Sequence, residues 1–121
     1  MPIKKVLIVD DSPTERYFLT ELLTKNGFAV SAAENAEEAV LKLKAATPDL
    51  ILMDVVMPGQ NGFQLTRTLS KDPATQSIPI IICTSKNQQT DRIWALRQGA
   101  RDYVSKPVKP DELLEKIAAL G

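Results

Sequence analysis

Residues 50–54 read Leu50-Ile51-Leu52-Met53-Asp54, four apolar side chains followed at once by a carboxylate. A continuous apolar run of this length, bounded by polar residues, is typical of a strand buried on both faces of a parallel sheet. The residue that follows such a strand lies at the carboxyl edge of the sheet, where open α/β folds gather their functional groups. The stretch therefore predicts a central strand that delivers Asp54 to a binding edge.

Three further apolar runs end in polar groups in the same way. Residues 6–9 lead into two aspartates, residues 80–83 into a threonine and a serine, and residues 103–104 into the sequence Ser-Lys-Pro. Because the carboxyl ends of parallel strands meet at one edge, these groups are expected to converge there. The convergent set holds three carboxylates, a hydroxyl and an ammonium: Asp10, Asp11, Asp54, Thr84 and Lys106.

Strand-like and helix-like segments alternate along the whole chain. Ser12 and Asn35 are suited to cap the first two helices, and Gly27 to end the first of them. Five strand–helix units in a chain of this length imply an α/β, doubly wound fold with a parallel sheet and helices on both faces. We expect strands at residues 5–9, 29–33, 50–53, 80–83 and 102–104, and helices at residues 13–26, 36–45, 62–70, 89–98 and 110–120.

The composition of this 121-residue chain restricts the classes of function. The length suits one domain, and fifteen basic residues balance fifteen acidic ones, so no net field favours DNA or RNA. The first residues carry no secretory leader, and no apolar run approaches the ~20 residues needed to cross a bilayer. Because the chain has a single cysteine, Cys83, it cannot form an internal disulfide, and we expect a reduced thiol in a cytoplasmic protein. Histidine is absent, which excludes a phosphohistidine or a histidine base in this chain.

Five short motifs, separated along the chain, carry a resemblance to a known family, and they occur in the same order as in that family. They resemble the receiver domain of bacterial two-component response regulators, and the resemblance covers essentially the whole chain. It implies a CheY-like, flavodoxin-like (βα)5 fold with strand order 2-1-3-4-5, which periodicity alone does not give. We also expect a single receiver domain over residues 1–121 with no output domain. The motifs are Asp10-Asp11, Asp54, Met57-Pro58-Gly59 with Gly62, Thr84-Ser85 and Lys106-Pro107.

The resemblance implies that a histidine kinase phosphorylates the chain on Asp54 in a reaction that requires Mg²⁺. It assigns Asp11, Asp54 and the backbone carbonyl of Val56 as direct metal ligands, with Asp10 acting through a bound water. Phosphoryl transfer needs an in-line nucleophile and neutralised oxygen charge, and Mg²⁺ suits a carboxylate-rich site. Taken singly, each of these aspartates could instead be a solvated loop residue, and Asp11 could be a favourable charge at the N-terminus of the first helix.

Four other residues have expected roles in binding the phosphoryl group or in signalling. Lys106 is expected to place its ammonium on a phosphoryl oxygen, from a Lys–Pro turn whose bond is typically cis in receivers. The resemblance implies that Thr84 moves toward the phosphate and that Tyr103 follows it inward. Tyr103 can equally be a partly buried strand aromatic. Trp94 is either packed in the fourth helix or, if exposed, part of an interaction surface.

Three rival classes are less well supported. A haloacid-dehalogenase-type phosphatase needs an acid two residues after its nucleophile, where this chain has Val56. A nucleotide or flavin module needs glycines in the first strand–helix loop, which is acidic here. A receiver used only as a docking module, without phosphorylation, is less well supported because every motif residue of the phosphorylation site is present. We therefore expect a signalling module and not an enzyme, one that catalyses only its own phosphorylation and autodephosphorylation.

Three segments further resemble small stand-alone regulators of twitching motility and type IV pilus chemosensory systems. They are residues 9–15, 57–64 and 97–103. The resemblance implies a CheA-like sensor histidine kinase or phosphotransfer protein as donor, and a downstream motor or signalling protein as reader. The regulator that binds the flagellar motor in chemotaxis is the alternative. We expect a monomer that does not bind DNA and does not insert into a membrane.

Overall fold

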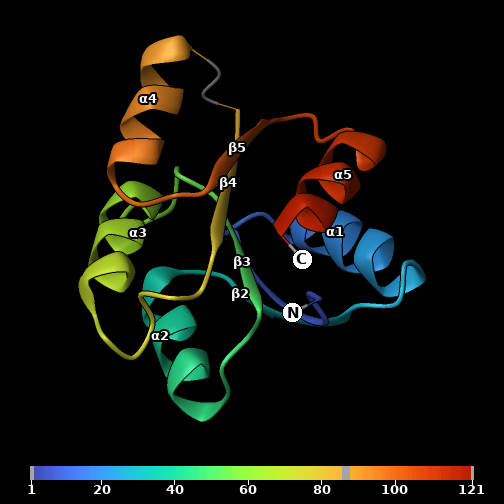
Figure 1. The fold of residues 1–121 in the computed structure, drawn as a ribbon, viewed down its shortest axis with the longest axis horizontal. Helices are drawn as coiled ribbons and strands as arrows, with labels where there is room; N and C mark the ends of the chain where they lie inside the picture. Colours follow the sequence, from blue (N-terminus) through green and yellow to red (C-terminus); the bar gives the residue numbers. More distant parts are fainter. Residues whose placement is uncertain (1, 86–87, 121) are drawn as a thin grey trace.

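The computed structural model describes residues 2–85 and 88–120, and these build one parallel five-stranded sheet in the order β2-β1-β3-β4-β5. Helices alternate with the strands, as the sequence predicts (Figure 1). The strands are β1 Lys5–Val9, β2 Ala29–Ala33, β3 Leu50–Met53, β4 Ile80–Thr84 and β5 Asp102–Ser105. The helices are α1 Pro13–Lys25, α2 Ala36–Ala45, α3 Gly62–Lys71, α4 Gln89–Arg97 and α5 Pro110–Leu120. The expected doubly wound fold and its strand order are confirmed.

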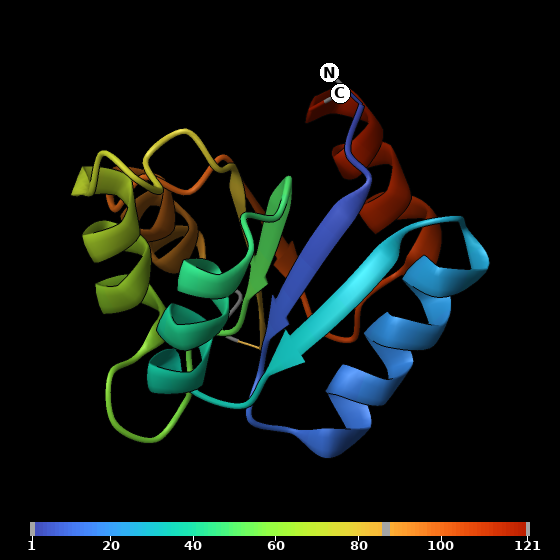
Figure 2. The ribbon, with the colours of Figure 1, turned by 90° about the horizontal axis from the view of Figure 1, so that it is seen from below.

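Two layers of helices cover the sheet, with α2, α3 and α4 on one face and α1 and α5 on the other (Figures 1 and 2). Alternate side chains of one strand supply the two cores, as the pleat requires. Leu7 packs in the cluster that includes α3, whereas Ile8 packs in the cluster that includes α1 and α5. All four residues of β3 are buried, which explains its uninterrupted apolar sequence.

The register of the central strands sets the position of the acidic groups. Val9 of β1 lies opposite Met53 of β3, so the aspartates that follow the two strands emerge side by side. The amide of Asp54 donates to the carbonyl of Val9 at 2.9 Å, and the amide of Asp10 donates to Ala33 at 3.0 Å. The strand ends are therefore joined by backbone hydrogen bonds directly beneath the carboxylates.

Local signals begin and end the helices largely as expected. The Ser12 hydroxyl accepts from the amide of Glu15 at 3.2 Å, and the Asn35 side chain accepts from Glu38 at 2.8 Å, so both N-caps are confirmed. Gly27 follows α1 with a φ of 89°, a left-handed conformation that glycine adopts without steric cost.

The observed boundaries differ from the predicted ones by single residues. Strand β4 includes Thr84 and strand β5 includes Ser105, because these residues pair with each other in the ladder. Helices α1 and α4 each end one residue earlier than predicted, and α3 extends to Lys71. Within residues 2–85 and 88–120, no helix has both the length and the apolar character needed to span a membrane.

Candidate functional site

Three carboxylates meet at the carboxyl edge of the sheet. Ligand oxygens of Asp10, Asp11 and Asp54 all lie within 4.8 Å of one another. Asp10 and Asp54 are buried, with 2% and 6% of their surface exposed, and Asp11 is exposed to solvent. Carboxylates held this close repel one another, so the site favours a cation over an empty cavity. Three hard oxygen donors beside open solvent fit the coordination that Mg²⁺ prefers.

The surroundings of Asp54 clearly shift the pKa of its carboxyl group. Burial raises the pKa of its carboxyl to about 6, and the charge of Asp10 acts in the same direction. The ammonium of Lys106 and the amide of Val55 oppose the rise, the latter by donating to Oδ1 at 2.9 Å. The ionised form of Asp54 is thus held at a cost in free energy that a cation would relieve.

Lys106 brings the one ammonium that contacts these carboxylates in the described part of the chain. Its Nζ donates to Oδ2 of Asp10 at 2.8 Å and lies 3.7 Å from Oδ1 of Asp54. Burial acts to lower the pKa of Lys106, but the hydrogen bond to Asp10 and the neighbouring carboxylates outweigh it, so the net shift is upward. The Lys106–Pro107 peptide bond is cis, as expected.

The oxygens of Asp10 are already engaged in hydrogen bonds within the protein. Oδ1 accepts from the amide of Ser12 at 2.9 Å, and Oδ2 accepts from Lys106. The backbone carbonyl of Asp10 accepts from the guanidinium of Arg16 at 2.8 Å. These contacts fix the carboxylate against the start of α1 and leave Asp11 as the more accessible member of the pair.

Thr84 and Val56 are the two remaining residues expected at the site, one at the end of β4 and one in the loop after β3. Thr84 is fully buried at the last position of β4, between the strands that end in Asp54 and Lys106. Its carbonyl accepts from the amide of Lys106 at 2.8 Å, so the lysine is tied to the end of β4. Val56, in the loop after β3, has a side chain that is 56% exposed.

Tyr103 and Trp94 occupy opposite environments. Tyr103 is buried, at 4% exposure, and its hydroxyl has no hydrogen-bond partner among the described residues. Burial and the charge of Asp91 both raise the pKa of this phenol. Trp94 is 49% exposed and lies with Ile93 and Leu96, which are also exposed, on α4. In this conformation Tyr103 is therefore buried on β5 and Trp94 is a surface residue, and the signalling roles expected for both stay predictions.

Two features of the site were not assigned a role from the sequence. A Cβ atom at Gly62 would lie 1.9 Å from the backbone oxygen of Asp54, so only glycine lets α3 start against the acidic loop. Glu15, on α1, has a buried Oε2 without a described partner, and its charge helps to raise the pKa of Lys106. The glycine at a helix start was a visible signal, whereas the orientation of Glu15 depends on packing that sequence does not reveal.

The fold and the acidic site together define a receiver domain, and the sequence profile of the response regulator receiver domain family matches residues 6–118. The chain belongs to this family. It is 54% identical to Protein PilH of Pseudomonas aeruginosa over 116 residues, which cover 96% of each protein. It is 36% identical to the phosphate regulon transcriptional regulatory protein PhoB of Escherichia coli, over 97% of this chain and 51% of that relative. The chain thus spans about half the length of PhoB.

Solved structures show the same architecture. The chemotaxis protein CheY4 of Vibrio cholerae superposes with a TM-score of 0.91 at 28% identity, over 98% of this chain and 99% of the other. The signal receiver domain of a signal transduction histidine kinase from Syntrophus aciditrophicus gives 0.89 at 36% identity, over 97% and 89%. The chain is therefore a CheY-like signalling module of two-component systems. Receivers are phosphorylated on an aspartate, bind Mg²⁺ in an acidic pocket, and work with a histidine kinase or phosphotransfer protein.

Proposed function

We propose that Asp54 is the phospho-acceptor of this receiver and that Asp10, Asp11 and Asp54 form its Mg²⁺ site. The observation that carries the proposal is the cluster itself: three carboxylates within 4.8 Å at the carboxyl edge of the sheet, with Lys106 beside them. Asp54 is its central member in the strand order, since it follows the middle strand β3, whereas Asp10 follows β1 and Lys106 follows β5. No other described group combines burial, a raised pKa and this position.

The reaction proposed is a phosphoryl transfer between two amino-acid side chains. A carboxylate oxygen of Asp54 attacks the phosphorus of a phosphohistidine on the donor, the N–P bond breaks, and the imidazole leaves with the bonding electron pair. The product is an acyl phosphate on Asp54. The bound Mg²⁺ would neutralise oxygen charge, with Asp11, Asp54 and the carbonyl of Val56 as protein ligands and Asp10 acting through a water.

The chain's own residues position the nucleophile and accept the new charge. The amide of Val55 holds Oδ1 of Asp54, which orients the carboxylate toward the loop. Lys106 lies 3.7 Å from Asp54 and can exchange its bond to Asp10 for one to a phosphoryl oxygen. Thr84, the last residue of β4, would offer its hydroxyl to a phosphoryl oxygen. Since Val56 supplies no acid two residues after Asp54, turnover is limited to autodephosphorylation.

The signal is proposed to leave through a phosphorylation-dependent protein contact in the cytoplasm. The exposed apolar side chains Ile93, Trp94 and Leu96 on α4 are the proposed contact surface. The three segments that resemble twitching-motility regulators, together with 54% identity to Protein PilH over nearly the whole chain, favour a pilus-type chemosensory pathway. A CheA-like kinase or phosphotransfer protein would then be the donor, and a monomer the active form. Flagellar chemotaxis is the second candidate, since the fold matches CheY4 with a TM-score of 0.91.

Incubation with acetyl phosphate and Mg²⁺ tests the acceptor directly. We expect one added phosphoryl group by intact mass, located on the peptide that contains Asp54. Asp54→Asn should take up none, while Asp72→Asn, at an acid on the C-terminal side of α3, should be labelled like the wild type. Wild-type labelling of Asp54→Asn would disprove the assignment. Loss of labelling in Asp11→Ala that excess Mg²⁺ restores would support the metal site.

A further inference from the structure

The outer edge of β2 is an open edge of the sheet. Strand β2 pairs with β1 and has no second neighbour among the described strands. The amide of Ala29 donates to Lys4 of the adjoining chain segment, and the carbonyl of Ala33 accepts from Asp10. Because backbone groups alternate along a parallel strand, Ala29, Ser31 and Ala33 bond toward β1. The amides and carbonyls of Val30 and Ala32 therefore point away from the sheet.

One of these outward groups is already covered. The ammonium of Lys42, on α2, donates to the carbonyl of Ala32. A lysine placed over a strand edge is a common protection against unwanted strand pairing. No such contact to Val30 occurs in the described residues, so its amide and carbonyl remain available for a main-chain partner. The open part of the edge is thus the N-terminal half of β2.

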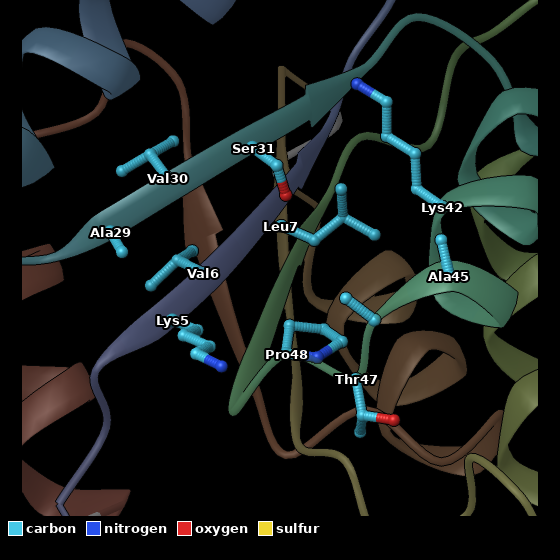
Figure 3. A pocket seen from close by; sticks show the side chains of 11 residues that line it. Lys5, Val6, Leu7, Ala29, Val30, Ser31, Lys42, Ala45, Thr47 and Pro48 are labelled. Atoms are coloured by element: carbon cyan, nitrogen blue, oxygen red, sulfur yellow. The ribbon is translucent and has the colours of Figure 1, made fainter.

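A hollow of about 310 Å³ opens beside this edge (Figure 3). The side chains of Leu7 and Ser31 point into it from the strands, and Lys42 reaches across its end from α2 (Figure 3). The hollow exists because the residues around it are small: Ala29 and Ser31 on β2 and Ala45 and Ala46 at the end of α2 do not fill the space. Its volume lies at the lower end of the ~300–1,000 Å³ typical of ligand pockets.

The charged side chains that line the hollow have one sign, and two acids lie just outside the lining, Glu38 beside Lys42 and Asp49 near Lys5. Its lining includes the lysines Lys5 and Lys42 and no acidic residue. Lys42 has one ion pair in the described part of the chain, a 3.8 Å contact with Glu38 on the same helix. Such an exposed i,i+4 pair stabilises only by a few tenths of a kcal/mol, so an external anion can compete with Glu38 for Lys42, whose ammonium also donates to the carbonyl of Ala32. The rim therefore favours a negatively charged partner.

We propose that the open edge of β2 and the adjoining hollow, here called the β2 groove, bind an extended acidic peptide segment of a partner protein. The segment adds a strand to β2 through the main chain of Val30, places an apolar side chain in the hollow, and sets acidic side chains near Lys5 and Lys42. A second copy of this chain fits less well, because two such lysine-lined edges would repel each other. A small ligand would use the hollow but not the main-chain groups of Val30.

The β2 groove is separate from the acidic cluster. It is lined by the first residues of β1 and β2, whereas Asp10 and Asp54 follow the last residues of their strands. Binding there is therefore expected to be independent of phosphorylation, which makes the groove an anchoring site for a partner and not a reader of the phosphate. Failure of this proposal would leave the function proposed for Asp54 unaffected.

An NMR titration with the blocked heptapeptide EVEFEVE tests the proposal. The amide of Val30 should exchange fast with solvent in the free protein, and at about 1 mM peptide its exchange should slow at least tenfold. Resonances of Ser31 and Ala45 should shift in the same titration. The peptide KVKFKVK, with reversed charge, and EVPFPVE, which cannot complete a strand ladder, should produce neither effect.

Matched variants separate the β2 groove from general electrostatic attraction. Lys42→Glu should weaken binding of EVEFEVE about tenfold, while Lys44→Glu, on the same helix but outside the lining, should change it less than twofold. Asp54→Asn should bind as the wild type does. The proposal is overturned if the Val30 amide still exchanges fast when the peptide-induced chemical shifts have reached saturation. It is also overturned if both lysine variants lose the same affinity for EVEFEVE, or if sedimentation without peptide shows a dimer joined through β2.

Discussion

Replacing Asp54 by asparagine should stabilise the metal-free protein, although it removes the proposed functional group. The carboxyl has its pKa raised from 3.8 to about 6, mainly by burial and by the charge of Asp10. A folded-state pKa above the unfolded one means that the ionised form is less favourable in the native protein than in the unfolded chain. At about 1.36 kcal/mol per unit, the full penalty is roughly 3 kcal/mol. Part of the carboxylate faces solvent, and its contact with Lys106 is lost in the variant, so we expect a net gain of about 1–2 kcal/mol.

The pH dependence gives this prediction a definite sign. The penalty is fully present above about pH 6, where native Asp54 is ionised, and it decreases as the pH falls toward 3.8, where both states are protonated. Urea denaturation of wild type and Asp54→Asn in EDTA should therefore give curves that separate at neutral pH and approach each other in acid. Glu115→Gln, at an exposed site on α5, is the control and should follow the wild type.

Added Mg²⁺ should reverse the order of the two proteins. At ~100 times the dissociation constant, binding to the native state alone adds about 2.7 kcal/mol to the free energy of unfolding of the wild type. Asp54→Asn lacks one ligand oxygen charge and should gain less. If Asp54→Asn is no more stable than the wild type in EDTA at neutral pH, the strain attributed to the carboxylate cluster is absent. If both proteins gain equally from Mg²⁺, the metal binds elsewhere.

Three further changes test the packing and electrostatics of the same edge. Gly62→Ala should lower the free energy of unfolding in urea by more than about 3 kcal/mol, because its Cβ would lie 1.9 Å from the backbone oxygen of Asp54. Gly59→Ala is the control: its Cβ would have no atom within 4 Å, so it should cost only about 1 kcal/mol for its positive φ. Lys106→Met should destabilise the metal-free protein by about 2 kcal/mol, because two buried carboxylates lose the ammonium beside them. Added Mg²⁺ should recover most of this loss in stability. An equal loss with and without Mg²⁺ would contradict the prediction. Thr84→Ala should still accept phosphate from acetyl phosphate but show a smaller change in Trp94 fluorescence, and an unchanged response would exclude Thr84 from the signalling path.

The five strands and the convergence of the acidic residues could be predicted from local, repeated signals, whereas the strand order came from the resemblance to receivers. Apolar runs such as Leu50–Met53 have no alternative to burial, and the residue after each run must lie at the sheet edge. Thr84 shows where this reasoning is least exact: it was placed after its strand, but its pairing with Ser105 makes it the last ladder residue. Boundaries depend on the neighbouring strand, which a single segment does not encode.

Side-chain arrangements at the site required the three-dimensional structure. Lys106 contacts Asp10 more closely than Asp54, although in the strand order β5 is nearer to β3 than to β1. The burial of Tyr103 depends on how α4 packs over the end of β5, and the hollow beside β2 depends on small residues from α2 and β2 lying opposite one another. Each is a contact between segments distant in sequence, which hydrophobic periodicity does not specify.

The contacts of Lys106 suggest how a charge on Asp54 reaches the surface that bears Trp94. A phosphoryl group can favour one arrangement only by interacting differently with the two states. We propose that Lys106 supplies that difference, because moving its ammonium from Asp10 to the phosphate would exchange a 2.8 Å hydrogen bond for a bond to a group of higher charge. Its amide is held by the carbonyl of Thr84, so the ends of β4 and β5 must adjust together. Tyr103 lies on β5 with a buried, unpartnered hydroxyl, which makes it the side chain on that strand with most to gain from a rearrangement that provides a hydrogen-bond partner.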